Sequence, residues 1–326
     1  MHKGFWKKIA EKAKKEKRPI VASASMANVT DAAFRRMIAK YGKPDVIWTE
    51  FVSCDGLCSV GKKNLILDLI FDKSERPIVV QFFGAKPENF YKCAQLAQKL
   101  GFDGIDINMG CPDKGVIRQG AGSALIKDHK LAQKIIKETI RGAGKLPVSV
   151  KTRIGFNEVE YKKWIPYLLK MDIAALTIHG RTKKEMSDVP AHWDMIGEVV
   201  KMRNKLKSKA LIIGNGDISS LADAQEKYEK YGVDGVMVGR ALFGTPWFFN
   251  RKKKDIALKA KLKLALEHTN LFEKIFKDKK HFDIMKKHYK AYVSGFDSAK
   301  KIRMRLMNVK NIDSAKKTFK GLISKI

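Results

Sequence analysis

Residues 77–112 read PIVVQFFGAKPENFYKCAQLAQKLGFDGIDINMGCP and contain one complete strand–helix–strand pattern. Two short apolar runs begin at Pro77 and Gly104, and the segment between them places Phe90 and Ala94 at helical spacing. Apolar runs that are continuous rather than alternating are typical of parallel strands covered on both faces. This stretch therefore predicts one βαβ unit of a parallel α/β fold.

The same pattern recurs along most of the chain. Eight apolar runs begin at Ile20, Val46, Pro77, Gly104, Pro147, Ala175, Ala210 and Gly235. Eight strand–helix units within about 245 residues fit an α/β (β/α)8 TIM barrel better than an open doubly wound sheet. A Rossmann-like sheet with extra strands is the alternative, but no G-x-G-x-x-G follows the first run. After the eighth run the pattern becomes helical, which predicts a small C-terminal helical domain.

The charge distribution divides the chain in the same way. The 326 residues carry 66 Lys and Arg against 34 Asp and Glu, a formal net charge of +32. We predict a basic N-terminal segment (1–18, net +6), a barrel domain (19–248) and a basic helical domain (249–326, net +16). Excess positive charge of this size favours a polyanionic partner, because the charges otherwise repel one another. The alternative is a lysine-rich, solvated surface with no such partner.

Composition also narrows the class of protein. No stretch of about 18 uncharged apolar residues is present, so we expect no membrane span. Four scattered cysteines do not form a disulfide framework, which favours a reducing, cytoplasmic setting. Cys54 and Cys58 form a C-x3-C pair without a second pair at metal spacing, so no metal site is expected. We expect a monomer.

Polar side chains stand at the C-terminal ends of the eight runs, where barrels build their active sites. They are Ser25 with Met26, Glu50, Gln81, Asn108 with Cys111, Lys151 with Arg153, His179 with Arg181, Asn215 with Asp217, and Gly239 with Arg240. One such residue alone could be a helix cap or a loop residue. Eight polar ends together predict a ring of side chains around a polar ligand, since polar groups buried without partners are costly.

Two of these ends suit a phosphate group, and one carries a reactive thiol. Glycine-rich turns at 214–217 and 239–240 follow the seventh and eighth runs, where barrels commonly bind phosphate. Cys111 follows N-M-G and precedes Pro112 at the end of the fourth run. A thiol of ordinary pKa, about 8.5, is mostly protonated at neutral pH and can act as a general acid. The alternative for a free cysteine is a small buried apolar residue, which describes Cys93 well.

Several of these elements together resemble the tRNA-dihydrouridine synthases. The motifs are SMANVTD (25–31), QFFG (81–84), DINMGCP (106–112), VKTR (150–153), IHGRT (178–182), GNGD (214–217) and GR (239–240). The likeness runs from about Pro19 through the C-terminal helices. It implies an FMN-dependent barrel followed by a helical domain that helps to hold tRNA. The family usually has proline where this chain has Ser25, so this serine could loosen the turn or add a hydroxyl contact.

The resemblance also implies the site residues. Those implied to contact FMN are Ser25, Met26, Ala27, Gln81, Lys151, His179, Asn215, Gly216, Asp217, Gly239 and Arg240. Those expected to orient the uracil are Asn108, Arg153 and Arg181, and Cys111 matches the proton donor.

The reaction implied is reduction of one uridine in tRNA to 5,6-dihydrouridine. Hydride passes from flavin N5 to C6 and a proton from Cys111 to C5, with NADPH, or alternatively NADH, as reductant. Three other functions remain open. They are an FMN oxidoreductase acting on a free pyrimidine, a catalytically idle tRNA-binding barrel, and a purely structural barrel. The uridine position that is reduced does not follow from the sequence.

Overall fold

The computed structural model describes residues 4–252, 256–294, 296 and 299–326. Its centre is one eight-stranded sheet of parallel strands in the order β1-β8-β7-β6-β5-β4-β3-β2. The strands are β1 (Ile20–Ser23), β2 (Ile47–Ser53), β3 (Ile78–Phe83), β4 (Gly104–Met109), β5 (Val148–Gly155), β6 (Ala175–Thr182), β7 (Leu211–Asn215) and β8 (Gly235–Val238). All eight predicted strands are confirmed, each beginning within one residue of its apolar run.

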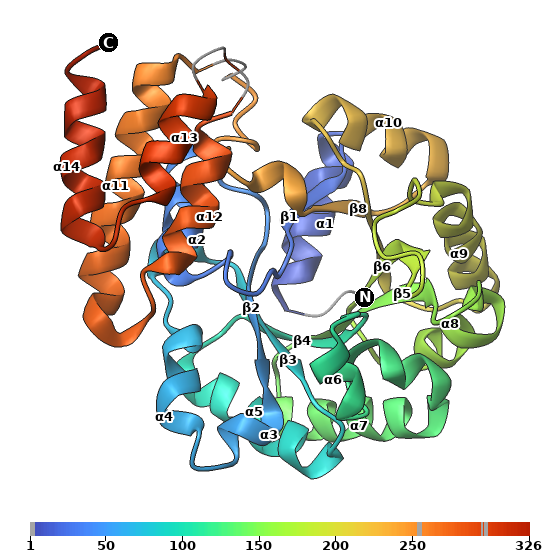
Figure 1. The fold of residues 1–326 in the computed structure, drawn as a ribbon. Coiled ribbons are helices and arrows are strands. Elements are labelled where there is room, and N and C mark those ends of the chain that lie inside the picture. The colour runs from blue at the N-terminus through green and yellow to red at the C-terminus, as the bar shows by residue number, and fades with distance from the viewer. Residues whose placement is uncertain (1–3, 253–255, 295, 297–298) are drawn as a thin grey trace.

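The sheet curves into a nearly closed barrel (Figure 1). The first and last strands pair in parallel, with Ile20 opposite Gly235. β1 meets β2 at a single parallel bridge between Ala22 and Val46, where the Ser23 N–H donates to the Val46 carbonyl at 3.1 Å. The (β/α)8 TIM-barrel prediction is therefore confirmed.

Helices surround the barrel and follow it toward the C-terminus. The α-helices are α1 (Phe5–Lys15), α2 (Ala32–Tyr41), α3 (Cys54–Leu57), α4 (Lys62–Leu65), α5 (Pro87–Leu100), α6 (Lys114–Arg118), α7 (His129–Ala143), α8 (Tyr161–Leu169), α9 (Trp193–Lys205), α10 (Leu221–Tyr231), α11 (Leu258–Phe276), α12 (Asp283–Tyr292), α13 (Ala299–Met307) and α14 (Ile312–Ile323). The 3-10 helices are η1 (Ile66–Leu69), η2 (Lys73–Glu75), η3 (Gly122–Lys127), η4 (Arg240–Leu242) and η5 (Lys277–Lys279).

The unit after β8 departs from the regular pattern. Its described residues, 239–252, contain only η4, and Gly244 with a φ of +69° and Pro246 follow closely. A glycine in the left-handed region and a proline both interrupt an α-helix. The chain then continues into the C-terminal helices.

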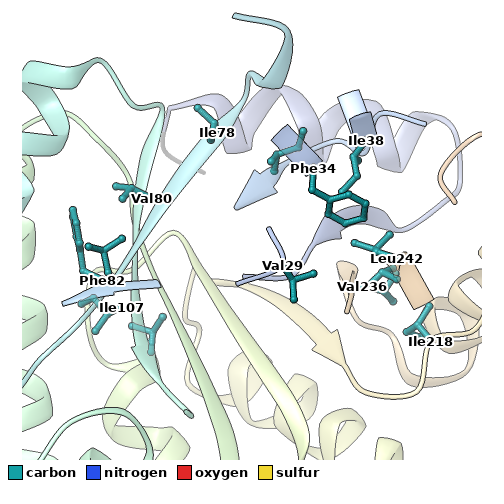
Figure 2. Close-up of a cluster of buried hydrophobic side chains, with 14 of the residues drawn as sticks. Val29, Phe34, Ile38, Ile78, Val80, Phe82, Ile107, Ile218, Val236 and Leu242 are labelled. Atoms are coloured by element: carbon teal, nitrogen blue, oxygen red, sulfur yellow. The ribbon is translucent and has the colours of Figure 1, made fainter. Parts of the chain in front are cut away.

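The C-terminal helices lie on one side of the barrel, where α11 and α12 pack against α2, and α13 and α14 pack on α12 and α11 (Figure 1). Phe34 and Ile38 of α2 and Leu242 after β8 are fully buried in this region (Figure 2). The same buried cluster continues into Phe272 of α11 and Tyr289 of α12. The helices and the barrel therefore share one hydrophobic core.

The N-terminal helix α1 covers the end of the barrel where the strands begin. Trp6 is 1% exposed, and its ring lies 5.9 Å from the ring of Trp48 in β2. The Phe5 ring is close enough to Gly104 that a Cβ at this glycine would lie 3.1 Å from it. The helix therefore closes the end of the barrel opposite the predicted site.

No helix in the described part of the chain is both long and apolar enough to cross a bilayer.

Candidate functional site

A cavity of about 200 Å³ opens at the C-terminal ends of β1, β5, β6, β7 and β8. It is called the strand-end cavity below. Nine of the eleven predicted cofactor residues line it, together with Arg181 and Ser187. These nine are Ser25, Met26, Lys151, His179, Asn215, Gly216, Asp217, Gly239 and Arg240. The other two, Ala27 and Gln81, are not among its lining residues: Ala27 is exposed, and Gln81 is buried within β3.

The strand-end cavity has a strongly positive lining. Lys151, Arg181 and Arg240 supply three cationic side chains, against the single carboxylate of Asp217. Burial, reinforced by the nearby charge of Arg153, lowers the pKa of Lys151 to about 8. Such a surplus of positive charge suits an anionic ligand, since a bound negative charge relieves the repulsion among the cations.

His179 is held as a neutral imidazole in this setting. Burial, followed by the positive charges of Arg153, Lys151 and Arg181, lowers its pKa well below the usual value. The Arg181 Nη1 lies 3.2 Å from the His179 Nε2. A guanidinium only donates, so Nε2 must accept, and the proton of the neutral ring is on Nδ1. His179 can therefore donate one hydrogen bond from Nδ1.

Asp217 holds two arginines at the edge of the cavity. Its Oδ2 accepts from Arg181 Nη2 at 2.5 Å and from the Ala191 N–H at 2.8 Å, and its Oδ1 accepts from Arg240 Nη2 at 2.7 Å. Burial alone would raise the pKa of Asp217, but the hydrogen bonds from Arg181 and Ala191 lower it. Because a carboxylate only accepts, Asp217 positions the arginines, and the arginines provide the donors for an anion.

Two features of the cavity wall fit a bound group. Gly216 has a φ of +130°, and a Cβ there would lie 2.6 Å from the Cβ of Ala191. Only glycine fits this position, because Ala191 fills the space that a side chain would need, and the Gly216 backbone lines the cavity. The Ser25 Oγ is buried without a hydrogen-bond partner, although Ser25 lines the cavity. A buried hydroxyl without a partner is costly unless a ligand or water supplies one.

Cys111 lies on the loop directly after β4. Its N–H donates to the Asn108 Oδ1 at 2.9 Å, and its carbonyl accepts from the Ser123 N–H at 3.1 Å. Burial raises the pKa of this half-buried thiol, although the Asp113 backbone, Arg153 and Lys151 oppose the shift. The thiol is therefore protonated at neutral pH, as a general acid must be.

A chain of hydrogen bonds orients this loop from inside the barrel. Gln81 Nε2 donates to the Asp106 Oδ2 at 2.6 Å, and Asn108 Nδ2 donates to the Gln81 Oε1 at 2.8 Å. The Asn108 Oδ1 then accepts the N–H groups of Gly110 and Cys111 at 3.1 and 2.9 Å. Because the Asp106 carboxylate only accepts, it determines which way both amides face.

Arg153 ties the Cys111 loop to the loop after β6. Its Nε donates to the Gly110 carbonyl at 2.8 Å and its Nη1 to the Thr182 carbonyl at 2.9 Å, and the residue is 6% exposed. Arg181 is 3% exposed and lies in the wall of the strand-end cavity. The structure thus places these two predicted substrate residues in different settings, one beside Cys111 and one beside Asp217.

Asp106 has a positioning role that the sequence analysis did not assign. Burial raises its pKa to about 6, while hydrogen bonds from Ser149 and Gln81 oppose that shift. One signal could have found it: Asp106 and Asn108 are two residues apart in β4, so both face the barrel interior. Ser187, which also lines the cavity, lies in a loop and had no comparable signal.

The remaining cavities and cysteines lie outside this site. A larger cavity of about 790 Å³ between α10 and residues 245–251 includes none of the predicted site residues. Cys54 and Cys93 are buried and Cys58 is exposed. Within the described ranges, no group of three or more His, Cys, Asp or Glu side chains is arranged to hold a metal ion.

Comparisons with solved structures give the same fold. Morphinone reductase matches with a TM-score of 0.52 and 12% sequence identity, over 71% of this chain and 84% of that one. A 2-naphthoyl-CoA reductase matches with a TM-score of 0.53 and 11% identity, over 72% of this chain and 49% of the other. At these identities the likeness concerns the fold alone.

Sequence comparisons identify the family. A probable tRNA-dihydrouridine synthase of Staphylococcus aureus (strain MRSA252) is 39% identical over 319 residues, covering 97% of this chain and 94% of the relative. A probable tRNA-dihydrouridine synthase 2 of Bacillus subtilis (strain 168) is also 39% identical, covering 97% and 95%. The family model described as dihydrouridine synthase matches residues 22–325. The chain therefore belongs to the dihydrouridine synthase family of flavin-dependent oxidoreductases.

Proposed function

We propose that this enzyme reduces a uridine of tRNA to 5,6-dihydrouridine with FMN as cofactor and NADPH as reductant. The observation that carries the proposal is a positively charged strand-end cavity with a protonated thiol, Cys111, on the neighbouring loop. The names of the relatives in S. aureus and B. subtilis support tRNA as the substrate. NADH is the alternative reductant.

The residues around the strand-end cavity suit FMN. Arg240 and the backbone at Gly216 and Gly239 would hold the phosphate, with Asp217 keeping Arg240 in position. Lys151 and the Nδ1–H of His179 would face the ring system, where positive charge stabilises a reduced, anionic flavin. The remaining proposed contacts are Ser25, Met26, Ala27, Gln81 and Asn215.

The chemistry divides between the cofactor and the protein. Bound FMN supplies the hydride that reaches C6 of the uracil ring. Cys111 donates the proton that C5 acquires, and its raised pKa keeps this proton on sulfur until then. Asn108 keeps the Cys111 backbone in place. Arg153 and Arg181 would orient the uracil carbonyls. A uridine must leave its stack to reach this site.

The helical domain (249–326) would hold the tRNA. Its net charge of +16 is half of the total, on a quarter of the chain. Sequence-independent contacts with phosphates provide most of the affinity in such complexes, and they weaken as salt rises. We propose that the basic N-terminal segment contributes mainly to stability, because Trp6 in its described part (4–18) is buried at the closed end of the barrel.

Two measurements test the proposed function. The purified protein should be yellow, with the absorption of an oxidised flavin, and should convert unmodified tRNA transcript to a dihydrouridine-containing product on addition of NADPH. Mass spectrometry of the digested tRNA would identify the position reduced. Equal or faster turnover of free uracil would instead indicate a free-pyrimidine oxidoreductase, and a colourless protein that binds tRNA would indicate an idle barrel.

FMN affinity should fall as pH rises through about 8. Lys151 is an ammonium below its pKa of about 8 and neutral above it. The ring carbonyls that Lys151 would face, and the FMN phosphate in the same cavity, favour the ammonium. Binding therefore takes up protons near this pH, and affinity drops by at most about tenfold per pH unit. Fluorescence titration of flavin-free protein between pH 7 and 9 measures this. Lys151→Met should bind more weakly at pH 7 and lose the pH dependence; an unchanged slope would contradict the assignment.

Asp106→Asn should disturb the orientation of the Cys111 loop. An asparagine at position 106 can donate an N–H to Gln81, so the Gln81 amide can flip. The Asn108 amide would flip with it, and its oxygen would no longer accept the Cys111 N–H. The hydrogen bond to a charged group is worth ~1.5–3 kcal/mol, so we expect uridine reduction to fall about tenfold or more. Asp113→Asn, on an exposed turn of the same loop, is the control and should retain activity. Equal rates in both variants would exclude this role for Asp106.

A further inference from the structure

Lys280 is the only cationic residue in the described part of the chain that forms an ion pair with Glu50. It lies between η5 and α12 in the helical domain, and its side chain is 11% exposed. Its Nζ is 2.7 Å from the Glu50 Oε2 in the middle of β2 and 2.7 Å from the Asp68 Oδ1 in η1. One lysine of the helical domain therefore forms ion pairs with two carboxylates of the barrel.

Glu50 connects this lysine to the loop after β1. Its second oxygen, Oε1, accepts the N–H of Asn28 at 2.5 Å. Asn28 has a φ of +56°, in the left-handed region that non-glycine residues rarely adopt. Met26, two residues earlier, lines the strand-end cavity, and its N–H donates to Thr30 Oγ1 at 2.9 Å. The Glu50 carboxylate thus fixes a strained turn that carries part of the cavity wall.

The charges around Glu50 show why Lys280 is needed. Asp31 is 1% exposed, and burial together with the negative charge of Glu50 raises its pKa to about 6. Asp68 is a third carboxylate nearby. Arg35 is the other cation close to Asp31, but its Nε already donates to Glu75 at 2.6 Å. Without Lys280, the repulsion among these carboxylates would lose the cation that forms ion pairs with both Glu50 and Asp68.

We infer that Lys280 is a positioning residue through which the helical domain, by way of Glu50, holds the Met26–Asn28 turn in the conformation that binds the cofactor. The inference rests on the proposed function, in which the strand-end cavity binds FMN. It makes cofactor binding in the barrel depend on the seating of the helical domain, although Lys280 itself does not line the cavity.

The test compares Lys280→Met with Lys279→Met. Lys279 is the exposed neighbour, so both variants lose one positive charge at nearly the same place. The FMN dissociation constant of flavin-free protein, measured by fluorescence quenching, should rise about 5- to 150-fold for Lys280→Met. It should change less than twofold for Lys279→Met. Affinity for tRNA, measured by filter binding, should change equally in the two variants. Lys280→Arg should restore most of the FMN affinity.

A second pair of variants separates positioning from general destabilisation. Glu50→Gln removes the charge but keeps an oxygen that can accept the Asn28 N–H. Adding Lys280→Met to Glu50→Gln should leave FMN affinity within twofold, even if Lys280→Met alone does not fold. A further loss in the double variant, or equal FMN affinity in Lys280→Met and Lys279→Met, would overturn the inference. A wild-type protein that binds no FMN would instead refute the proposed function.

Discussion

Cys111→Ala is expected to lower the rate of uridine reduction by about 10²–10⁴-fold, the usual contribution of a positioned general acid. The thiol is half-buried and its pKa is raised by burial, so it is protonated at neutral pH. Alanine removes the thiol and its proton but keeps the backbone N–H, which donates a hydrogen bond to the Asn108 side chain. The measurement is dihydrouridine formed per minute under single-turnover conditions, with the flavin reduced beforehand.

FMN content is the control for this variant. Cys111 does not line the strand-end cavity, so Cys111→Ala should remain yellow and bind FMN with unchanged affinity. Cys58→Ala removes an exposed thiol elsewhere and should keep full activity. Full activity in Cys111→Ala would remove Cys111 from the proposed mechanism. Loss of both colour and activity would show that the cysteine supports the fold of the site instead.

Trp6→Ala is expected to lower the free energy of unfolding by about 3–5 kcal/mol, the range for removing a large buried aromatic side chain. Trp6 is 1% exposed and packs on Trp48. The same buried cluster contains Ile20 and Leu211 from the beginnings of β1 and β7. The lost ring would leave a cavity at the closed end of the barrel. Urea unfolding followed by circular dichroism measures the change.

Lys8→Ala is the matched control for this prediction. Lys8 is an exposed residue of the same helix, so its replacement should change stability by less than about 0.5 kcal/mol. FMN affinity should be the same in both variants, because Trp6 lies at the opposite end of the barrel from the strand-end cavity. A loss below about 1 kcal/mol for Trp6→Ala would mean that α1 does not close the barrel in solution.

The amino-acid sequence alone was enough to predict the barrel. Continuous apolar runs at regular intervals have few ways to be buried, and eight of them with helices between fit one closed parallel sheet. The strand ends were predicted less closely, because Glu50, Gln81 and Lys151 lie within β2, β3 and β5 rather than after them. Nine of the eleven predicted cofactor residues nevertheless line one cavity, since the C-terminal halves of neighbouring parallel strands lie close together.

Local sequence did not reveal how the polar side chains use one another. Asp217 was predicted as a cofactor contact, yet both of its oxygens accept from arginines that lie 36 and 23 positions away. Gln81 was predicted to face the flavin, and its amide is engaged with Asp106 and Asn108. These pairings depend on which strands become neighbours, and no periodicity within a strand encodes them.

The sequence by itself determined the fold, the family and the rim on which the site is built, because hydrophobic periodicity and motif residues are local properties of the chain. Only the tertiary structure decided that Asp106 directs the amides of Gln81 and Asn108, and that Lys280 reaches Glu50 from 230 positions away. Hydrogen bonds and ion pairs act over a few ångströms, so they form only between groups that the completed fold has brought together.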